Sequence, residues 1–420
     1  MEKENFCPLK KIEVERYCRQ VILPEIGPEG QKRISNSKVL VVGAGGLGAP
    51  CLMYLAGAGV GEIGVIDGDC VDTSNLHRQV IHSTSNKGIN KAKSAAQYIE
   101  SLNPNIKVNI YEEHLTNKNA LKIAVNYDML IDCCDNPATR YLTNDICVVL
   151  NKPLVSGSAV KWEGQLTIYI KDSINNSVNS LPCYRCLFPI PPPTKAVCNC
   201  ADAGVFGPVP GVIGTMQANE AIKLIIGAQD KILSRRMLAY DAYEMSFKIF
   251  RLRTRKSDCI ACGDIDKRQI THDNLEDYDY NEFVNPKAGQ VDLRLEIPAE
   301  NNLKWTDFLE GDSLLGNSNE KIRSVIDVRP VEQFDMFRLN IKNCRLINVP
   351  YKKIHDDANV MENLLEFKKE DNIFVMCRAG NQSTHAVKLL LERGYVNTFN
   401  LENGIHGYIN EIDSKDTPYY

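Results

Sequence analysis

The chain has 420 residues, a formal net charge of −4 and 24% charged residues, which is ordinary composition for a globular protein. This length is enough for two or three domains, each with its own core. The slightly acidic balance excludes a general nucleic-acid binder, which would carry a basic surface, so no direct contact with nucleic acid is expected.

The first residues, 1–5, contain no apolar targeting segment, so a cytoplasmic location is expected. The uncharged stretch 39–61 could span a bilayer, but its glycines and Pro50 suit a turn and close helix packing. No membrane span is therefore predicted. In a reducing compartment the 15 cysteines are core residues, metal ligands or reactive thiols. Four lie in apolar runs and are predicted to be buried: Cys51, Cys133, Cys134 and Cys147.

Residues 13–33 are predicted to be largely helical, with Arg16 and Arg19 one turn apart on one face. From the residues alone, the simplest interpretation is a solvated face of an amphipathic helix.

Residues 38–79 contain the most informative sequence pattern of the chain. An apolar run, 38–42, leads into a G-x-G-x-x-G turn, and Asp67 follows 19 positions after its last glycine. This order predicts strand, tight turn, helix, second strand and carboxylate, the phosphate-binding half of a nucleotide fold. Glycine lets backbone N–H groups approach phosphate oxygens, and Asp67 is placed to accept hydrogen bonds from ribose hydroxyls. The turn glycines are Gly43, Gly45, Gly46 and Gly48.

Two more acids and then Ser74-Asn75-Leu76-His77-Arg78 follow Asp67. Arg78 is a fixed cation close to where charge would develop on phosphates. A NAD-dependent oxidoreductase has no use for this run, which makes that alternative class unfavourable. The run resembles the signature of the ubiquitin-activating-enzyme-like adenylyltransferases, which include the activators of the molybdopterin and thiamine sulfur carriers. The resemblance implies ATP as the substrate and contacts from Ser74 to Arg78 with it.

The same resemblance assigns roles to two further residues. Residues 16–20 are similar to the family's N-terminal helix, where an arginine reaches the partner's ATP across a homodimer, and Arg19 is the matching position. Lys91, in the predicted helix 87–102, matches a ligand of the ATP phosphates.

A buried parallel strand, 127–132, is followed by Asp135 and Asn136. Open α/β sheets bind ligands beyond the carboxyl ends of their strands, so Asp135 is predicted to hold Mg²⁺. A helix cap before Pro137 is the structural alternative, and the two roles are compatible. The next two strands, within 153–171, are too close in sequence for a crossover helix, so this half of the sheet is predicted to be antiparallel.

Two C-x-x-C pairs are separated by 72 residues and match a tetrahedral zinc site that stabilises a fold: Cys183, Cys186, Cys259 and Cys262. Between them, residues 191–207 are predicted to form an extended crossing loop. In the family, a cysteine in such a loop forms covalent intermediates with the carrier, and Cys200 matches that pattern. Cys198 remains a second candidate.

Residues 264–290 are acidic and poor in aliphatics, and are predicted to be a linker, with a partner-binding strip as the alternative. Beyond it, a strand that ends at Cys377 feeds a loop and a helix, a geometry in which backbone dipoles favour a terminal anionic sulfur. A cysteine-type phosphatase would need arginine where Ser383 stands. The loop, and Asp327-Val-Arg329 upstream, instead resemble the rhodanese sulfurtransferases. The usual Asn-Asp-Ser of that family reads Asn381-Gln382-Ser383 here.

The predicted fold is α/β: a Rossmann-like mixed sheet with a four-cysteine zinc site in residues 1–263, an acidic linker in 264–290, and an α/β rhodanese domain in 291–420. The paired resemblance implies ATP-dependent adenylation of a ubiquitin-like sulfur carrier ending in Gly-Gly, followed by transfer of sulfur from Cys377. A cysteine desulfurase or thiosulfate would load that sulfur. The implied roles are tRNA thiolation and protein conjugation, or molybdopterin-synthase sulfurylation; a catalytically inactive scaffold is the remaining alternative.

Overall fold

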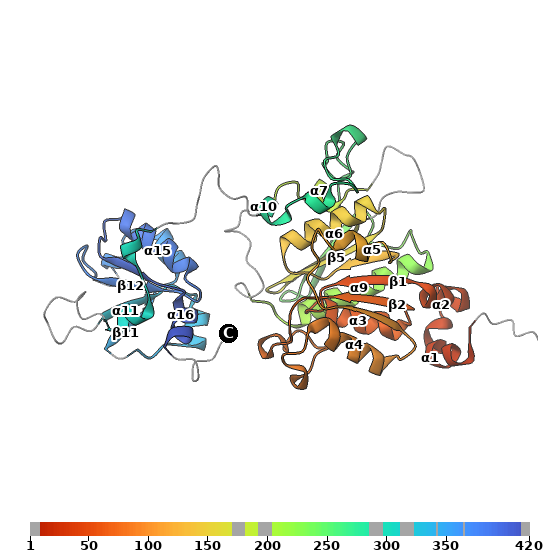
Figure 1. Ribbon diagram of the computed structural model, residues 1–420, viewed down its shortest axis with the longest axis horizontal. Helices are drawn as coiled ribbons and strands as arrows, with labels where there is room; N and C mark the ends of the chain where they lie inside the picture. The colour runs from red at the N-terminus through yellow and green to blue at the C-terminus, as the bar shows by residue number, and fades with distance from the viewer. Residues whose placement is uncertain are drawn as a thin grey trace, which may run out of the picture. The chain divides into compact units, whose positions relative to one another are not determined.

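The computed structural model describes residues 9–169, 181–191, 204–284, 297–310, 323–341, 343–363 and 366–412. The chain divides into two compact units, with the boundary between Pro286 and Lys287, and each is built around its own sheet (Figure 1). Among the helices of these ranges, none combines the length and the apolar character needed to cross a membrane.

The first unit contains an eight-stranded sheet in the order β3-β2-β1-β4-β5-β6-β7-β8. Strands β3 to β5 pair in parallel, and β5 to β8 pair antiparallel, so the predicted mixed sheet is confirmed. The strands are β1 (Lys38–Val42), β2 (Glu62–Ile66), β3 (Lys107–Tyr111), β4 (Met129–Asp132), β5 (Leu154–Val160), β6 (Glu163–Tyr169), β7 (Arg236–Asp241) and β8 (Ser246–Arg251).

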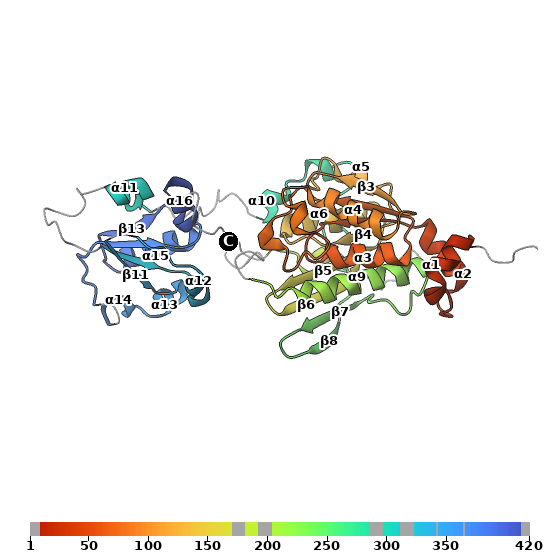
Figure 2. The same ribbon diagram turned by 90° about the horizontal axis from the view of Figure 1, so that it is seen from below.

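Helices cover both faces of this sheet. Side chains alternate along β1, so Val39 and Val41 join one core with α3, α4 and α9, whereas Leu40 and Val42 join another with α5 and α6. Figure 2 shows α3 and α9 running side by side. The helices of the unit are α1 (Lys11–Val21), α2 (Gly27–Asn36), α3 (Gly48–Ala58), α4 (Lys91–Leu102), α5 (Ala120–Ala124), α6 (Pro137–Val149), α7 (Tyr184–Leu187), α9 (Pro208–Ile226) and α10 (Tyr280–Val284).

The turn between β1 and α3 requires glycine for two different reasons. Gly43 has φ +96°, a left-handed conformation that side chains disfavour, and a Cβ there would lie 2.8 Å from the carbonyl oxygen of Cys133. A Cβ on Gly48 would lie 2.0 Å from the carbonyl oxygen of Gly43. The turn is therefore packed tightly against both the start of α3 and the end of β4.

The second unit contains a five-stranded parallel sheet in the order β11-β10-β12-β13-β9. Its strands are β9 (Asn302–Leu303), β10 (Arg323–Asp327), β11 (Cys344–Asn348), β12 (Ile373–Met376) and β13 (Thr398–Leu401). One core contains side chains of α11 (Trp305–Glu310) and α16 (Gly404–Glu411), and the other those of α13 (Tyr351–Asp356), α14 (Val360–Asn363) and α15 (Asn381–Glu392). A short helix, α12 (Val331–Met336), follows β10.

Residues 264–284, which the sequence analysis assigns to a linker, are packed on the first unit in the structure. Ile270, Leu275, Tyr280 and Val284 are buried in the core that contains α5 and α6, so this stretch is part of the first unit. The acids between them set the composition of the stretch, whereas its few apolar residues are widely spaced and give no strong periodic pattern. The rest of the predicted linker, 285–290, lies outside the described residues.

A buried ion pair attaches this stretch to the rest of the unit. The Arg185 guanidinium donates to the Asp145 carboxylate from Nε at 2.8 Å and from Nη2 at 2.7 Å, and both side chains are almost fully buried. The Tyr280 hydroxyl donates to the same carboxylate at 2.9 Å. The rings of Tyr141 and Phe283 lie 4.9 and 4.5 Å from the Arg185 guanidinium carbon. One carboxylate on α6 therefore joins α7 and α10.

Replacing Asp145 tests this junction. Asp145→Ala leaves the Arg185 charge buried without a partner, so the free energy of unfolding of the first unit should fall by about 3–5 kcal/mol. Urea unfolding followed by Trp162 fluorescence in a Trp305→Phe background measures it, because these are the two tryptophans of the chain. The reciprocal background, Trp162→Phe, reports the second unit, which should be unaffected. An unchanged Trp162 transition would contradict the assignment.

Candidate active site

A cavity of about 720 Å³ lies at the carboxyl ends of β1, β2, β4 and β5. Parallel strands place these ends at one edge of the sheet, where open α/β sheets bind ligands. Eight of the residues predicted to contact nucleotide line this cavity: Gly43, Gly45, Gly46, Asp67, Arg78, Lys91, Asp135 and Asn136. The structure thus brings together predicted residues from separate segments of the chain.

The glycine turn is held from two sides. The Asp67 carboxylate accepts hydrogen bonds from the backbone N–H groups of Ala44 at 2.8 Å and Asp69 at 2.9 Å. Burial raises the pKa of this carboxyl. On the other side, His82 Nε2 lies 2.9 Å from the Ala44 carbonyl oxygen, and its Nδ1 lies 2.8 Å from Ser94 Oγ. A neutral imidazole that donates from Nε2 and accepts at Nδ1 satisfies both contacts.

Lys91 begins α4 and is buried, although a cation at a helix N-terminus is disfavoured by the helix dipole. Its Nζ pairs with Asp69 Oδ2 at 2.9 Å, and Asn90 caps the helix through the N–H groups of residues 92 and 93. A buried cation in an unfavourable position, beside a cavity, favours an anionic ligand there.

Within residues 74–78, two residues accept hydrogen bonds from the side chain of Arg78 and hold it in place. Asn75 Oδ1 accepts from Arg78 Nη2 at 2.8 Å, and the Ser74 carbonyl accepts from Nη1 at 3.3 Å. Asp72 caps this turn by accepting from Ser74 N–H at 2.8 Å. Ser74, Asn75, Leu76 and His77 are not among the residues that line the cavity, whereas Arg78 is.

Helix α6 follows β4, and the two residues directly before it, Asp135 and Asn136, have different roles. Asn136 Oδ1 accepts from Thr139 N–H at 2.8 Å, and Pro137 occupies the first turn. The cap proposed as an alternative role for Asp135 is therefore supplied by Asn136. Asp135 is exposed and lines the cavity.

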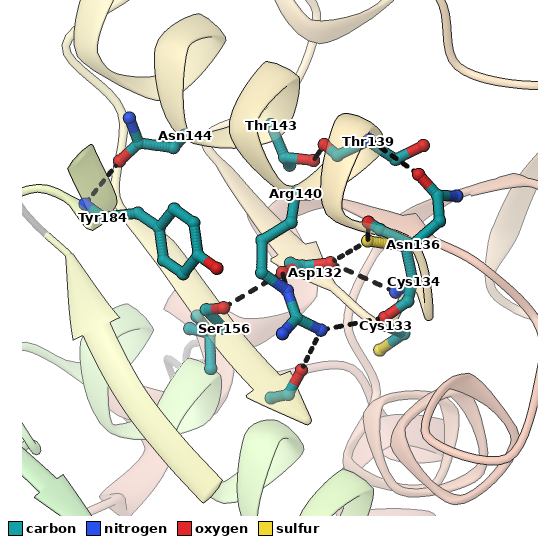
Figure 3. A network of polar contacts seen from close by, with 12 residues as sticks. Asp132, Cys133, Cys134, Asn136, Thr139, Arg140, Thr143, Asn144, Ser156 and Tyr184 are labelled. Carbon is teal, nitrogen blue, oxygen red and sulfur yellow. Dashed lines mark hydrogen bonds and ion pairs between the residues drawn. The ribbon is translucent and has the colours of Figure 1, made fainter. Parts of the chain in front are cut away.

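The residues beyond Asp132 form the polar network shown in Figure 3. Asp132 is fully buried at the end of β4 and accepts from Arg140 Nε at 3.1 Å and from Ser156 Oγ at 3.0 Å. Arg140 Nη2 donates to the carbonyls of Cys134 at 3.0 Å and Gly157 at 3.1 Å. The network ties the ends of β4 and β5 to α6.

Several cavity residues were missed by the sequence prediction. Gln79 follows the recognised run directly, and its Oε1 is buried without a hydrogen-bond partner in the described part of the chain. An orphaned buried amide oxygen beside the glycine turn fits a cavity that is completed by a polar ligand such as a nucleotide. Arg140 and Tyr184 also line the cavity and give no local signal, because their roles depend on which segments meet in the fold.

Two predicted catalytic residues are not placed at this cavity. Arg19 is exposed on α1 and does not line the cavity, so its predicted role depends on a second copy of the chain. Cys200, like Cys198, lies outside the described residues. The described chain resumes at Gly204, whose carbonyl accepts from Lys161 N–H at 2.9 Å, and Val205 lines the cavity.

The four predicted metal ligands come together. Their sulfur atoms all lie within 4.8 Å of one another, with separations of 3.9 Å for Cys183–Cys186, 3.7 Å for Cys183–Cys259 and 3.4 Å for Cys186–Cys262. Tetrahedral zinc with Zn–S bonds of about 2.3 Å requires S···S separations of roughly 3.8 Å. The N–H of Lys256 also lies 3.3 Å from the sulfur of Cys186. The donor set fits a thiophilic ion of this size.

In the second unit, Cys377 is buried directly after β12. The backbone N–H of Gly380 lies 3.1 Å from its sulfur, and Ser383 Oγ lies 3.4 Å away, at the start of α15. Gly380 has φ +88° and lets the loop turn around the sulfur. Asp327 and Arg329, the other predicted features of this unit, form a buried ion pair at 2.6 Å at the end of β10.

Comparisons with known proteins agree with both units. Residues 17–261 match the model of the ThiF family, and residues 311–411 match that of the rhodanese-like domain. Adenylyltransferase and sulfurtransferase MOCS3 of Culex quinquefasciatus is 42% identical, covering 100% of this chain and 92% of that protein. Adenylyltransferase and sulfurtransferase UBA4 of Candida albicans is also 42% identical, covering 97% and 90%. A crystal structure of E. coli MccB with MccA-N7isoASN shares the fold, with TM-score 0.52 and 23% identity over 60% of this chain and 75% of that one.

Fold and sites together define a class: a nucleotide-binding adenylyltransferase unit joined to a sulfurtransferase unit. The chain belongs to the ThiF family, and its C-terminal part is a rhodanese-like domain. The class and fold predicted from the sequence are confirmed.

The buried position of His82 leads to a prediction of how the free energy of unfolding depends on pH. Burial lowers the pKa of His82 below its ordinary value of 6.5. Below about pH 6.5 the unfolded chain therefore binds a proton that the folded chain does not, so the free energy of unfolding should fall as the pH falls through this window. Urea unfolding at pH 7.5 and 5.5 should show a smaller fall for His82→Gln than for the wild type. His272→Gln, at an exposed histidine, is the control. Equal pH dependence in all three proteins would contradict the prediction.

Proposed function

We propose that this enzyme adenylates the C-terminal glycine of a ubiquitin-like sulfur carrier ending in Gly-Gly, and then converts the carboxylate to a thiocarboxylate with sulfur from the rhodanese-like domain. The observation that carries the proposal is the single cavity where the glycine turn, two cations and an exposed carboxylate meet. The names of the full-length relatives, adenylyltransferase and sulfurtransferase, support both activities.

In the proposed first step, a carboxylate oxygen of the carrier attacks the α-phosphorus of ATP, and diphosphate leaves. Backbone N–H groups of the glycine turn bind phosphate oxygens, while Lys91 and Arg78 offset the charge that develops on the phosphates. Asp67 and the residues from Ser74 to His77 keep these groups in place. Arg19 of a second copy would add a further cation in a homodimer.

Asp135 would hold Mg²⁺ through its exposed carboxylate, since this ion usually takes one or two carboxylates together with phosphate oxygens. When bound, the ion supplies positive charge that favours departure of diphosphate. The four cysteines would hold Zn²⁺ as a structural ion, because a closed four-thiolate site leaves no open position for substrate.

In the proposed second step, the Cys200 thiolate attacks the acyl-adenylate to form a thioester, and AMP leaves. The terminal sulfur of the Cys377 persulfide attacks this thioester, which releases the Cys200 thiol and gives an acyl-persulfide. A thiol then cleaves the S–S bond, which leaves the thiocarboxylate on the carrier and a disulfide that a cellular thiol reductant reduces. Cys377 carries the sulfane sulfur, whose negative charge would be stabilised by the N–H of Gly380 and the Ser383 hydroxyl. A cysteine desulfurase or thiosulfate would load it. The reaction requires reduced thiols and suits the cytoplasm.

The product would serve thiolation of the tRNA wobble uridine and protein conjugation. Molybdopterin-synthase sulfurylation is the second candidate, since two sets of relatives carry different names, MOCS3 and UBA4. Either role uses the same thiocarboxylate chemistry.

The adenylation step is tested by exchange of labelled diphosphate into ATP. Exchange should require a carrier ending in Gly-Gly. Lys91→Met and Asp135→Asn should each lower its kcat by roughly 10²-fold, as expected for removal of a group that stabilises developing charge. Lys93→Met removes an exposed lysine from the same helix and is the control, so its exchange rate should equal that of the wild type. A loss of exchange in Lys93→Met would show that helix α4 itself is disturbed. NADH binding without any exchange would refute the proposal.

The sulfur step is tested separately by mass spectrometry of the carrier's C-terminus after incubation with ATP and thiosulfate. Cys377→Ser should abolish thiosulfate sulfurtransfer, whereas Cys344→Ser, at a half-buried cysteine of the same unit, should retain it. Cys200→Ser should keep diphosphate exchange but lose thiocarboxylate formation. If Cys198→Ser behaves this way and Cys200→Ser does not, the assignment moves to Cys198.

A further inference from the structure

The loop that follows β12 in the second unit contacts the turn that follows β13. These two strands pair in parallel, so residues 377–380 and residues 402–406 leave the sheet at the same edge. The Ile405 N–H donates to the Cys377 carbonyl at 2.9 Å, and the His406 N–H donates to the Arg378 carbonyl at 3.1 Å. Both donors belong to the first turn of α16, where backbone N–H groups have no partner inside the helix. The start of α16 therefore binds two carbonyls of the cysteine loop.

This contact leaves no room for a side chain at Gly404. A Cβ there would lie 2.1 Å from the Cys377 carbonyl oxygen, and Gly404 has φ +51°. Asn403, directly before it, has φ +56°, a left-handed conformation that asparagine adopts more readily than most residues. On the loop side, a Cβ on Gly380 would lie 3.1 Å from the Asn403 nitrogen. The loop and the turn therefore pack backbone against backbone.

The turn is also held by parts of the unit other than the cysteine loop. Trp305 of α11 is fully buried and donates from Nε1 to the Gly404 carbonyl at 2.7 Å. The Glu402 N–H donates to the Leu303 carbonyl of β9 at 2.8 Å. Because the turn is fixed to the core in this way, it can hold the cysteine loop in one orientation.

The orientation of two peptide groups bears on the sulfur. In a planar trans peptide the C=O and the N–H point in opposite directions. Because the carbonyls of Cys377 and Arg378 point toward α16, the N–H groups of the residues that follow them point away from α16. The next N–H of the loop, that of Gly380, lies 3.1 Å from the Cys377 sulfur. A carbonyl turned toward this sulfur would repel a terminal anionic sulfur, whereas N–H groups stabilise it.

We propose that residues 403–406 position the cysteine loop for sulfur transfer, and that Gly404 is the residue on which this positioning depends. The turn keeps the carbonyls of Cys377 and Arg378 away from the sulfur, so that N–H groups of the loop remain available for the negative charge of a persulfide. The inference rests on Cys377 as the sulfur carrier of the proposed function, and it adds positioning residues outside the cysteine loop.

Transfer of sulfur from thiosulfate to cyanide isolates this step. The Cys377 thiolate attacks the outer sulfur of thiosulfate, and sulfite leaves with the electron pair of the broken S–S bond. Cyanide then attacks the terminal sulfur of the persulfide, which releases thiocyanate and returns the Cys377 thiolate. The reaction requires no carrier and no ATP, so it reports the second unit alone.

Gly404→Ala in the full chain is the first test. The kcat of thiosulfate sulfurtransfer should fall roughly 10²-fold, as expected when preorganised donors are displaced, while the KM for thiosulfate stays within about threefold. Carrier-dependent diphosphate exchange, which reports the first unit, should be unchanged.

Gly394→Ala is the matched control. Gly394 has φ +88°, so alanine is strained there as well, but an added Cβ would approach only Lys369 Cδ, at 4.0 Å. Both variants should lower the urea midpoint of the second unit, followed by Trp305 fluorescence in a Trp162→Phe background. Only Gly404→Ala should lose sulfurtransfer per folded molecule, and equal kcat values in the two variants would overturn the inference.

A pair of variants at Asn403 decides the matter if Gly404→Ala does not fold. Asn403 is exposed, so Asn403→Gly and Asn403→Ala differ mainly in how readily the backbone adopts φ +56°. The kcat should stay within about twofold of the wild type in Asn403→Gly and fall roughly 3- to 10-fold in Asn403→Ala. Equal values in this pair would overturn the inference, while sulfurtransfer by the wild type still supports the proposed function. Absence of sulfurtransfer by the wild type would refute the sulfur step of the proposed function, and this inference with it.

Discussion

The carboxylate of Asp132 is buried at the end of β4, where it accepts hydrogen bonds from Arg140 on α6 and Ser156 on β5. Its backbone carbonyl accepts from Gln217 of α9 at 2.7 Å. Because a buried charge is tolerated only when it is paired and hydrogen-bonded, these partners cannot move independently. One residue therefore joins two strands and two helices at the edge of the sheet where the cavity lies.

This constraint separates two kinds of charge in the cavity. Arg140 is held by three acceptors, and its charge is paired with the fully buried Asp132. Lys91 pairs with Asp69, an exposed residue, and Arg78 is held only by acceptors of its own turn. These two cations are better suited to a highly charged ligand, since their charge is less fully neutralised by buried groups. This difference agrees with the proposed binding of ATP by Lys91 and Arg78.

The glycine turn by itself does not distinguish an adenylyltransferase from a dehydrogenase. Both use backbone N–H groups at a helix N-terminus to bind phosphates. The distinction comes from other features of the chain: the support of Arg78 by Ser74 and Asn75, the exposed Asp135 directly before the Asn136 cap, and the presence of a second unit with a cysteine loop. The inert-scaffold alternative is disfavoured by the match of both units to enzyme families and by the full-length relatives, which are named adenylyltransferase and sulfurtransferase.

The sequence alone predicted both domain classes and the mixed sheet, and it singled out the glycine turn, the four cysteines that cluster and the loop at Cys377. Each rests on residues close together in the chain, where φ preference, side-chain alternation or ligand spacing leaves few alternatives. The structure decided what the sequence patterns left open: that residues 264–284 pack on the first unit through widely spaced apolar side chains, that Asn136 and not Asp135 caps α6, and that Arg140 and Tyr184 line one cavity. The cap is local, but its sequence allowed either residue, whereas the packing of 264–284 and the meeting of Arg140 with Tyr184 join segments far apart in sequence, which the burial of both sheet faces brings together.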